Sequence, residues 1–305
     1  MRCPHSQYFR RGCRDPGAGH CPPPSGWWQL TAKTLLITGC SSGIGETCAR
    51  GMKARGWRVF ATARKPEDIA RLEADGLETL YLDYAEPASI EACVAAVAAR
   101  TGGRLDALFN NGAYGQPGAV EDLTRAVLEA QFQANVFGWH DLTRRSIPLM
   151  RANGAGRIVQ CSSVLGIVAL KWRGAYNASK FAIEALSDTM RLELKPFNID
   201  VVIIEPGPIA SKFVIHALEA FDRNIDEAVS HYREVYVKQR KRLQKTKPGR
   251  FKLPPDAVLE KLIHALESPR PKIRYTVTTP TLVMSWCKRL LPPRMLDRVI
   301  DKASD

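Results

Sequence analysis

The fold is decided by the stretch Thr34-Leu35-Leu36-Ile37-Thr38-Gly39-Cys40-Ser41-Ser42-Gly43-Ile44-Gly45. Its first half is a short apolar run, which predicts a strand buried on both faces. Its glycines allow the backbone to approach a pyrophosphate closely, and the helix expected after them offers unpaired N–H groups. Because a tight strand-to-helix turn also favours glycine, the motif gains weight only from its place in the chain.

That place is the start of a regular alternation of strands and helices. Short apolar runs predict strands at Thr34–Thr38, Arg58–Ala61, Thr79–Leu82, Ala107–Phe109, Arg157–Cys161 and Ile199–Ile204, with a further short one at Lys272–Tyr275. Helical spacing lies between them, at Gly45–Arg55, Ala88–Ala99, Glu121–Arg151 and Tyr176–Leu194. This alternation predicts an α/β fold, a doubly wound parallel sheet of about seven strands with helices on both faces.

Composition and charge exclude several classes of protein. The chain has 305 residues, of which 45% are hydrophobic and 25% charged, as in ordinary globular proteins. The net charge of +13 sits in the tails, because residues 31–237 carry 23 basic and 24 acidic side chains. A nucleic-acid-binding core is therefore not expected. No apolar stretch reaches the length of about 18 residues that a membrane-spanning helix needs.

The eight cysteines favour a reduced, cytoplasmic protein. The first 30 residues carry basic side chains but no apolar core of a signal peptide. Cys3, His5, Cys13, His20 and Cys21 lack the paired spacing of a zinc site, so we expect no metal.

Three more motifs follow the glycines in a fixed order. They are Asn135 in Asn135-Val136-Phe137-Gly138, Ser163 in Cys161-Ser162-Ser163, and Tyr176-Asn177-Ala178-Ser179-Lys180. With the G-x₃-G-x-G spacing of Gly39, Gly43 and Gly45, they make the chain resemble the short-chain dehydrogenase/reductases over roughly residues 32–275. The order of Arg270–Tyr275 and the tail after it resembles the branch of steroid and retinol dehydrogenases and bacterial carbonyl reductases. The resemblance implies a Rossmann-like fold and a homodimer or homotetramer, paired through the helices after strands four and five.

The catalytic residues implied by the resemblance are Asn135, Ser163, Tyr176 and Lys180. Residues four apart share a helix face, so Tyr176 and Lys180 are expected to point into the same space. A phenol has a pKa near 10, and a neighbouring ammonium together with a positively charged nicotinamide would lower it. Tyr176 would then exchange a proton with the substrate oxygen, and Ser163 would hold that oxygen by a hydrogen bond. By resemblance, Lys180 also binds the nicotinamide ribose, and Asn135 orders a water towards it.

The choice of cofactor rests on the end of the second strand. An NAD site favours an acidic residue there, whereas this chain has Arg64 and Lys65 and no acid until Glu67. A cation at this place can pair with a 2′-phosphate, so NADP(H) is preferred and NAD(H) remains an alternative. The expected cofactor-binding residues are Gly39, Ser41, Ser42, Gly43, Ile44, Gly45, Arg64, Asp83, Asn110, Gly112, Tyr176, Lys180, Pro206, Gly207, Ile209 and Ser211. Gly112 stands in Asn110-Asn111-Gly112-Ala113, where the family has N-N-A-G with the last two residues exchanged.

The remaining segments flank or cover this domain. We expect residues 1–30 to be a disordered or non-native extension, residues 31–275 to be the catalytic domain, and residues 276–305 to be a helical tail that Pro292 and Pro293 split. A substrate lid is predicted over residues 211–252. The stretch from Lys238 to Lys252 holds eight basic residues and no acid, which fits a solvated face, attraction of an acidic substrate, or contact with an anionic lipid surface. The basic amphipathic tail could dock on the enzyme, pair two subunits or lie on a membrane.

Taken together, these features predict an NADP-dependent oxidoreductase that interconverts a carbonyl, an apolar aldehyde or ketone, and an alcohol by hydride transfer. The partner is a small molecule and not a nucleic acid. A nucleotide-binding redox sensor or scaffold without turnover is the alternative, since fold alone does not decide function. The four catalytic residues argue against that alternative, because a sensor does not need all of them.

Overall fold

A computed structural model describes residues 32–243 and 251–304 of the chain. Within these ranges, all strands join one parallel sheet in the order β3-β2-β1-β4-β5-β6-β7. They are β1 (Thr34–Ile37), β2 (Arg58–Ala63), β3 (Glu78–Tyr81), β4 (Ala107–Asn110), β5 (Gly156–Cys161), β6 (Ile199–Glu205) and β7 (Arg274–Thr276). The predicted doubly wound α/β fold is confirmed. The first and last residues of every predicted strand lie within two residues of those of the observed strand. The prediction for residues 1–30 falls outside the described ranges.

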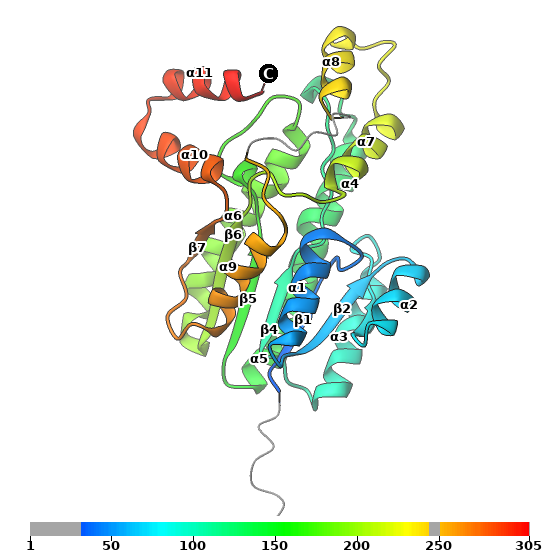
Figure 1. Ribbon diagram of the computed structural model, residues 1–305, viewed down its shortest axis with the longest axis vertical. Helices are drawn as coiled ribbons and strands as arrows, with labels where there is room; N and C mark the ends of the chain where they lie inside the picture. The colour runs from blue at the N-terminus through cyan, green and yellow to red at the C-terminus, as the bar shows by residue number, and fades with distance from the viewer. Residues whose placement is uncertain (1–31, 244–250, 305) are drawn as a thin grey trace, which may run out of the picture. The chain divides into compact units, whose positions relative to one another are not determined.

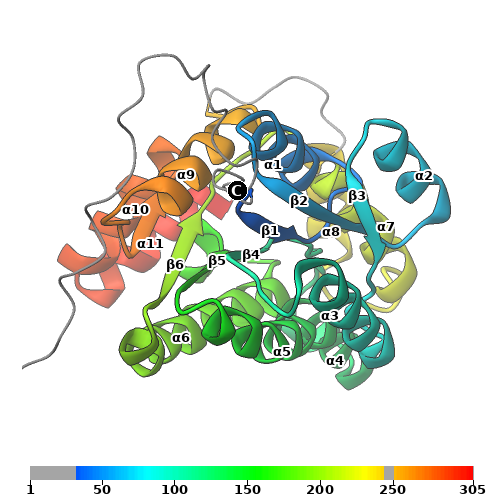
Figure 2. The same cartoon turned by 90° about the horizontal axis from the view of Figure 1, so that it is seen from below.

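Helices cover both faces of this sheet, as Figures 1 and 2 show. Helices α1 (Gly43–Ala54) and α9 (Asp256–Glu267) pack on one face, and α3 (Pro87–Thr101), α5 (Gly138–Ala152) and α6 (Gly174–Leu194) pack on the other. The remaining helices are α2 (Pro66–Ala74), α4 (Arg125–Phe132), α7 (Phe213–Asn224), α8 (Arg233–Leu243), α10 (Thr279–Leu290) and α11 (Pro293–Ser304).

The strand order determines where a ligand can bind. Chain connections run outward in one direction from β1 to β3 and in the other from β4 to β7, so the two crossovers diverge between β1 and β4. Every residue of β1 and β4 is buried, which fits the continuous apolar runs of these central strands. In such sheets the crevice at the carboxyl ends of the strands, at the point of divergence, is the binding site. The predicted motif residues follow β1, β4, β5 and β6 at that end.

The long helix predicted over Glu121–Arg151 is divided in the structure. A 3₁₀ turn at Val120–Asp122 comes first, and α4 begins only after Thr124, whose hydroxyl accepts a hydrogen bond from the Val127 N–H. That cap supplies an acceptor for one of the orphan N–H groups at the helix start. A π-helical segment, Gln133–Phe137, then separates α4 from α5. One extra residue per turn changes which side chains face inward, and such bulges are frequent at functional sites.

The segment after β6 leaves the sheet, and its two ends pair with each other by backbone hydrogen bonds. The Ala210 N–H donates to the Leu253 carbonyl at 2.8 Å, and the Leu253 N–H donates to the Pro208 carbonyl at 3.1 Å. Helices α7 and α8 lie between these anchor points and pack on a small second core of Ala119, Phe221, Ile225 and Tyr236. The Tyr236 hydroxyl accepts a hydrogen bond from the Ala119 N–H and donates one to Asp122, which joins α8 to the loop before α4.

The C-terminal region forms two helices, with the break at Leu291-Pro292 where the paired prolines predicted it. Helix α11 turns Leu296 inward, and its Asp301 forms an ion pair with Lys171, in the loop before α6. In the two described ranges, no helix is long and apolar enough to cross a membrane. The cysteines in these ranges, Cys40, Cys48, Cys93, Cys161 and Cys287, carry free thiols.

Candidate active site

The turn after β1 is built on direct backbone contact between glycines. Gly39 has a φ of +70°, and a Cβ there would lie 2.5 Å from the Cα of Gly112. A Cβ on Gly45 would lie 2.2 Å from the Gly39 carbonyl oxygen, so neither position has room for a side chain. Helix α1 starts directly after this turn, and the side chain of its N-cap residue, Ser42, makes no capping hydrogen bond. The first N–H groups of α1 are thus available to a ligand, which fits the pyrophosphate of a dinucleotide.

The ends of β1 and β4 are fastened together beside this turn. The Thr38 hydroxyl accepts hydrogen bonds from the N–H groups of Asn111, at 2.8 Å, and Gly112, at 3.1 Å. The Asn111 side chain donates back to the Thr38 carbonyl at 3.0 Å. Neither Thr38 nor Asn111 was predicted as a site residue, although both lie in the quoted motifs. The sequence feature that could have indicated them is a polar residue at the end of each of two strands that are neighbours in the parallel sheet.

Asn110, which was predicted to bind the cofactor, turns its side chain into the core. It is fully buried, and its amide donates to the Thr143 hydroxyl on α5 at 2.9 Å. Its side chain therefore holds β4 against α5, and only its backbone remains for a ligand. Gly112 stays in contact with Gly39 despite the exchanged Gly-Ala order, because it is the position that touches the turn.

Arg64 and Asp83 meet at the ends of β2 and β3. The guanidinium lies 3.5 Å from the carboxylate, and the Arg64 side chain is 70% exposed. Asp83 also accepts a hydrogen bond from the Ala85 N–H at 2.9 Å, which fixes its carboxylate at the strand end. The two predicted residues are thus neighbours, and the exposed cation can turn towards a ligand without losing a buried contact.

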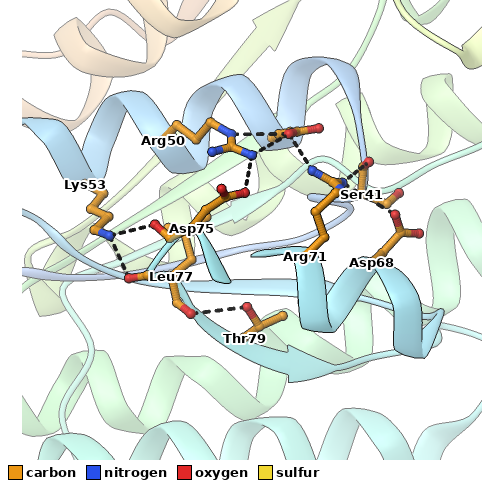
Figure 3. Close-up of polar contacts among 10 residues, drawn as sticks. Ser41, Arg50, Lys53, Asp68, Arg71, Asp75, Leu77 and Thr79 are labelled. Carbon is orange, nitrogen blue, oxygen red and sulfur yellow. Dashed lines mark hydrogen bonds and ion pairs between the residues drawn. The ribbon is translucent and has the colours of Figure 1, made fainter. Parts of the chain in front are cut away.

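A polar network joins α1 and α2 beside the glycine turn (Figure 3). Arg71 donates to the Ser41 carbonyl and to the Glu46 carboxylate, both at 2.7 Å. Arg50 binds the same carboxylate, which holds the pKa of Glu46 below its usual value despite partial burial. Exposed ion pairs contribute little to stability, at about 0–1 kcal/mol each, so the main effect of Arg71 is to fix the Ser41 backbone. The sequence pattern did not indicate Arg71, which lies in α2, a helix apart from the motifs.

Tyr176, Lys180 and Ser163 come together at the carboxyl end of β5. Tyr176 and Lys180 lie one turn apart on α6, and the Ser163 hydroxyl lies close enough to the Tyr176 phenol to affect its pKa. Lys180 is 1% exposed, and its ammonium donates to the Cys161 carbonyl at 2.8 Å and lies 4.2 Å from the ring centre of Trp139. A carbonyl and an aromatic face thus surround this cation. Trp139 was not predicted, because one aromatic residue on a helix carries no signal of a cation nearby.

Asn135 is brought to the same place by the π-helical segment. It is fully buried, and its amide donates to the Tyr114 carbonyl at 2.9 Å and to the Ser179 hydroxyl at 3.2 Å. Its carbonyl oxygen accepts from the Tyr114 N–H at 3.2 Å. Asn135 therefore holds the loop after β4 against α6. Its contact on α6 is Ser179, the residue before Lys180. All four predicted catalytic residues lie in this one region.

Burial sets the pKa values of the two ionisable groups in opposite directions. It raises the pKa of Tyr176 above the usual value for a phenol, while the nearby Ser163 hydroxyl lowers it in part. The sequence predicted a lowered pKa from the neighbouring ammonium together with a bound, positively charged nicotinamide. The chain alone does not produce it, because Lys180 binds the Cys161 carbonyl and lies 5.6 Å from the Tyr176 ring centre. Burial lowers the pKa of Lys180 to about 8.

The loop after β6 closes the site from the other side. The Pro206 carbonyl accepts a hydrogen bond from the Val164 N–H at 2.9 Å, next to Ser163. A Cβ on Gly207 would lie 2.1 Å from the Thr278 hydroxyl, and one on Gly43 would lie 2.9 Å from the Ser211 Cβ. The predicted residues of this loop, Pro206, Gly207, Ile209 and Ser211, therefore lie between the glycine turn and the Ser163 segment. Phe213, which follows, packs its ring on Tyr176 with 5.3 Å between ring centres.

Comparison with known proteins identifies the family. The family profile described as short chain dehydrogenase matches residues 33–220. The chain belongs to the short-chain dehydrogenase family. An uncharacterized oxidoreductase of Escherichia coli K12, YbbO, is 41% identical over 89% of this chain and 95% of its own. The NADPH-dependent 3-dehydrocapnine reductase of Ornithobacterium rhinotracheale is 30% identical, over 88% of this chain and 95% of its own.

A solved structure of similar fold is that of a short-chain dehydrogenase from Streptomyces avermitilis. It superposes with a TM-score of 0.72 at 32% identity and covers 88% of this chain and 93% of that one. As a member of this family, the present chain is an NAD(P)-dependent oxidoreductase with a Rossmann-like fold.

A methyl group on Gly45 tests the glycine turn. In Gly45→Ala the new Cβ meets the Gly39 carbonyl, so the turn must open, at a cost of about 1–3 kcal/mol. We expect the dissociation constant for NADPH, measured by nucleotide fluorescence, to rise about 10-fold or more. Gly51→Ala is the matched control, because its Cβ in the same helix meets only the Leu259 side chain. Unchanged NADPH affinity in Gly45→Ala would contradict the assigned role of the turn.

Proposed function

We propose that this enzyme interconverts a carbonyl and an alcohol with NADP(H), and that Tyr176 is its acid–base residue. The observation that carries the proposal is the meeting of Tyr176 and Ser163 beside the buried Lys180, at the same sheet end as the glycine turn. A hydroxyl pair of this kind can hold one substrate oxygen from two sides. The bound nicotinamide supplies or accepts the hydride at the carbon of that substrate.

In this proposal each residue of the chain has one task. Ser163 donates a hydrogen bond to the substrate oxygen and stabilises the charge that develops there. Tyr176 gives its proton to that oxygen in reduction and takes one back in oxidation. Lys180 adds a positive charge close to the phenol, and Asn135 keeps the loop after β4 against α6 so that the site retains its shape. The alternative of a redox sensor without turnover leaves this set of contacts without a purpose.

Removing one hydroxyl tests the proposal. We expect Tyr176→Phe to lose about 10²–10⁴-fold in kcat for NADPH-dependent reduction of a panel of aliphatic, aromatic, steroid and retinoid carbonyls, because the proton donor is gone. Its NADPH dissociation constant should stay within about 2-fold of the wild type, since Tyr176 is one of many contacts. Tyr81→Phe, at an exposed position on β3, is the control. Full turnover in Tyr176→Phe would refute the assignment, and tight NADPH binding without turnover in the wild type would favour the sensor.

The preference for NADP rests on Arg64. Its exposed guanidinium at the end of β2 can pair with a 2′-phosphate, and the carboxylate that an NAD site has there is missing. The 3-dehydrocapnine reductase, a relative, is named as NADPH-dependent. Asp83 beside Arg64 then faces the adenine side of the same pocket.

Reversing this charge tests the preference. Arg64→Asp should lower kcat/KM with NADPH about 10–100-fold, because a charge-assisted pair is lost and a repulsion is added, while activity with NADH stays equal or rises. Arg125→Asp, on the exposed surface of α4, makes the same change of charge elsewhere and should leave the ratio unaltered. Unchanged NADPH selectivity in Arg64→Asp would overturn the assignment.

The lid and the substrate class form part of the proposal. We assign residues 31–275 to the catalytic domain, with residues 211–252 as its lid and residues 276–305 as a tail. The backbone pairing of Pro208 and Ala210 with Leu253 supports these lid bounds, because it joins the two ends of the segment. Phe213 on Tyr176 places an aromatic ring where a substrate would lie, which favours an apolar carbonyl compound. Pairing of subunits into a homodimer or homotetramer stays a prediction.

We also propose that the tail contacts an anionic membrane surface. Leu282, Trp286 and Leu290 recur every fourth residue of α10 and are 48%, 55% and 71% exposed. Helix α10 contains no acidic residue, and Lys288 and Arg289 lie at its end. A two-fold contact between copies would bring these cations together, whereas anionic lipids complement them.

Vesicle co-sedimentation tests this contact. The full chain should bind vesicles containing anionic lipid more than neutral ones, and Trp286→Ser with Leu290→Ser should weaken binding about 10-fold or more, because two large apolar side chains leave the bilayer. Val229→Ser with Leu192→Ser removes exposed apolar groups elsewhere and is the control. Absence of vesicle binding, or a change of oligomeric state in the α10 variant, would refute the membrane contact.

A further inference from the structure

A partly buried acidic cluster adjoins the proposed active site. Glu205 is the last residue of β6, immediately before Pro206, and its side chain is 3% exposed. Arg274 on β7 pairs in register with Ile203, two residues before Glu205, so the two side chains share one face of the sheet. The Arg274 guanidinium lies 3.3 Å from the Glu205 carboxyl, and it also binds Asp188 at 2.7 Å and Glu184 at 3.1 Å on α6.

The cluster touches all three segments that make up the catalytic centre. Glu184 lies one turn after Lys180 on α6, beside the Ser162 hydroxyl. Gly166 allows this approach, because a Cβ there would lie 2.6 Å from the Ser162 hydroxyl and 3.1 Å from Glu184 Cγ. Glu205 continues into Pro206, whose carbonyl holds the Val164 N–H. A change in the cluster is therefore transmitted through short contacts to α6, to the Ser163 segment and to the loop after β6.

The three carboxyls of the cluster share one close guanidinium. The carboxyls that face Glu205 are Glu184 and Asp188 from α6, and the cations are Arg274 from β7 and Arg289 from α10. Arg274 is shared among all three carboxyls, and Asp188 has a further partner in Arg191 at 3.3 Å. Burial and the charge of Glu184 raise the pKa of Glu205 to about 7, and burial also raises the pKa of Glu184. Near neutral pH, Glu205 thus exists in both protonation states.

We propose that Glu205 is a positioning residue whose protonated form holds the Pro206 loop and the Ser163 segment against α6, and whose ionisation loosens that contact. This inference rests on the proposed function, since it concerns the same site. An ionised Glu205 repels Glu184 across the shared Arg274, and because Glu205 is joined directly to Pro206, this repulsion acts on the Pro206 loop. Enzyme activity is therefore coupled to a group that touches neither substrate nor cofactor.

The test compares the wild type with Glu205→Gln, which keeps the shape of the protonated form. In the wild type, kcat/KM should fall roughly 3-fold or more between about pH 6 and pH 8 through an inflection near the pKa of Glu205. That inflection should be absent in Glu205→Gln, which retains the activity of the low-pH form. Glu78→Gln, which removes a carboxylate paired with Arg58 on the far strands of the sheet, should keep the wild-type profile. A Glu205→Gln profile that follows the wild type, or a uniform loss of activity at every pH, overturns the proposal.

Thermal unfolding gives a readout that does not need turnover. A carboxyl whose pKa is raised in the fold stabilises it when protonated, so this stability is lost as the pH rises through about 7. The Tm of the wild type should therefore fall relative to that of Glu205→Gln between about pH 5 and pH 8. An equal dependence of Tm on pH in both proteins would refute the ionisation of Glu205. If this difference is present but no carbonyl is reduced, the failure lies with the proposed function and not with Glu205.

Discussion

The contact between the backbones of Gly39 and Gly112 is the constraint on which the site depends. It joins the ends of β1 and β4, the two strands from which the crossovers diverge, and it leaves no room for a Cβ on Gly39. The Thr38 hydroxyl then fixes the same junction by accepting from two N–H groups of the β4 end. Because β4 continues into the loop that Asn135 clamps to α6, the cofactor turn and the catalytic helix are positioned by one continuous set of short contacts.

A buried cation held by a backbone carbonyl and an aromatic ring is the second feature that shapes the centre. The Lys180 ammonium has lost nearly all of its water, and its close neighbours are a backbone carbonyl and the face of Trp139. Desolvation therefore lowers its pKa, in contrast to the raised pKa of Tyr176 next to it. Each group disfavours its charged form in the chain alone. The free-energy cost of exchanging a proton between Tyr176 and the substrate is therefore lowest when a further charge or dipole is bound between Tyr176 and Lys180.

The sequence predicted those features that depend on local pattern. Apolar runs gave the strands because strands buried on both faces leave few polar positions, and the spacing of Tyr176 and Lys180 placed both on one helix face. It did not predict the π-helical segment that turns Asn135 inward, because an extra residue in a turn has no signature in hydrophobic periodicity. The sequence also did not predict that the Asn110 side chain points into the core, because its partner Thr143 lies on a later helix.

Electrostatics was the least predictable level, for a physical reason. The expected lowering of the Tyr176 pKa combined an ammonium one turn away with a bound, positively charged nicotinamide; in the chain alone the ammonium faces a carbonyl and an indole ring. Direction of a side chain and burial, not distance along the chain, decide such effects. The same holds for Glu205, which looks in the sequence like an ordinary strand-end carboxylate before Pro206. Only the fold buries its carboxyl and brings Glu184 of α6 beside it. Burial first, and then the charge of Glu184, raise the pKa of Glu205 to about 7, although the guanidinium of Arg274 acts in the opposite direction.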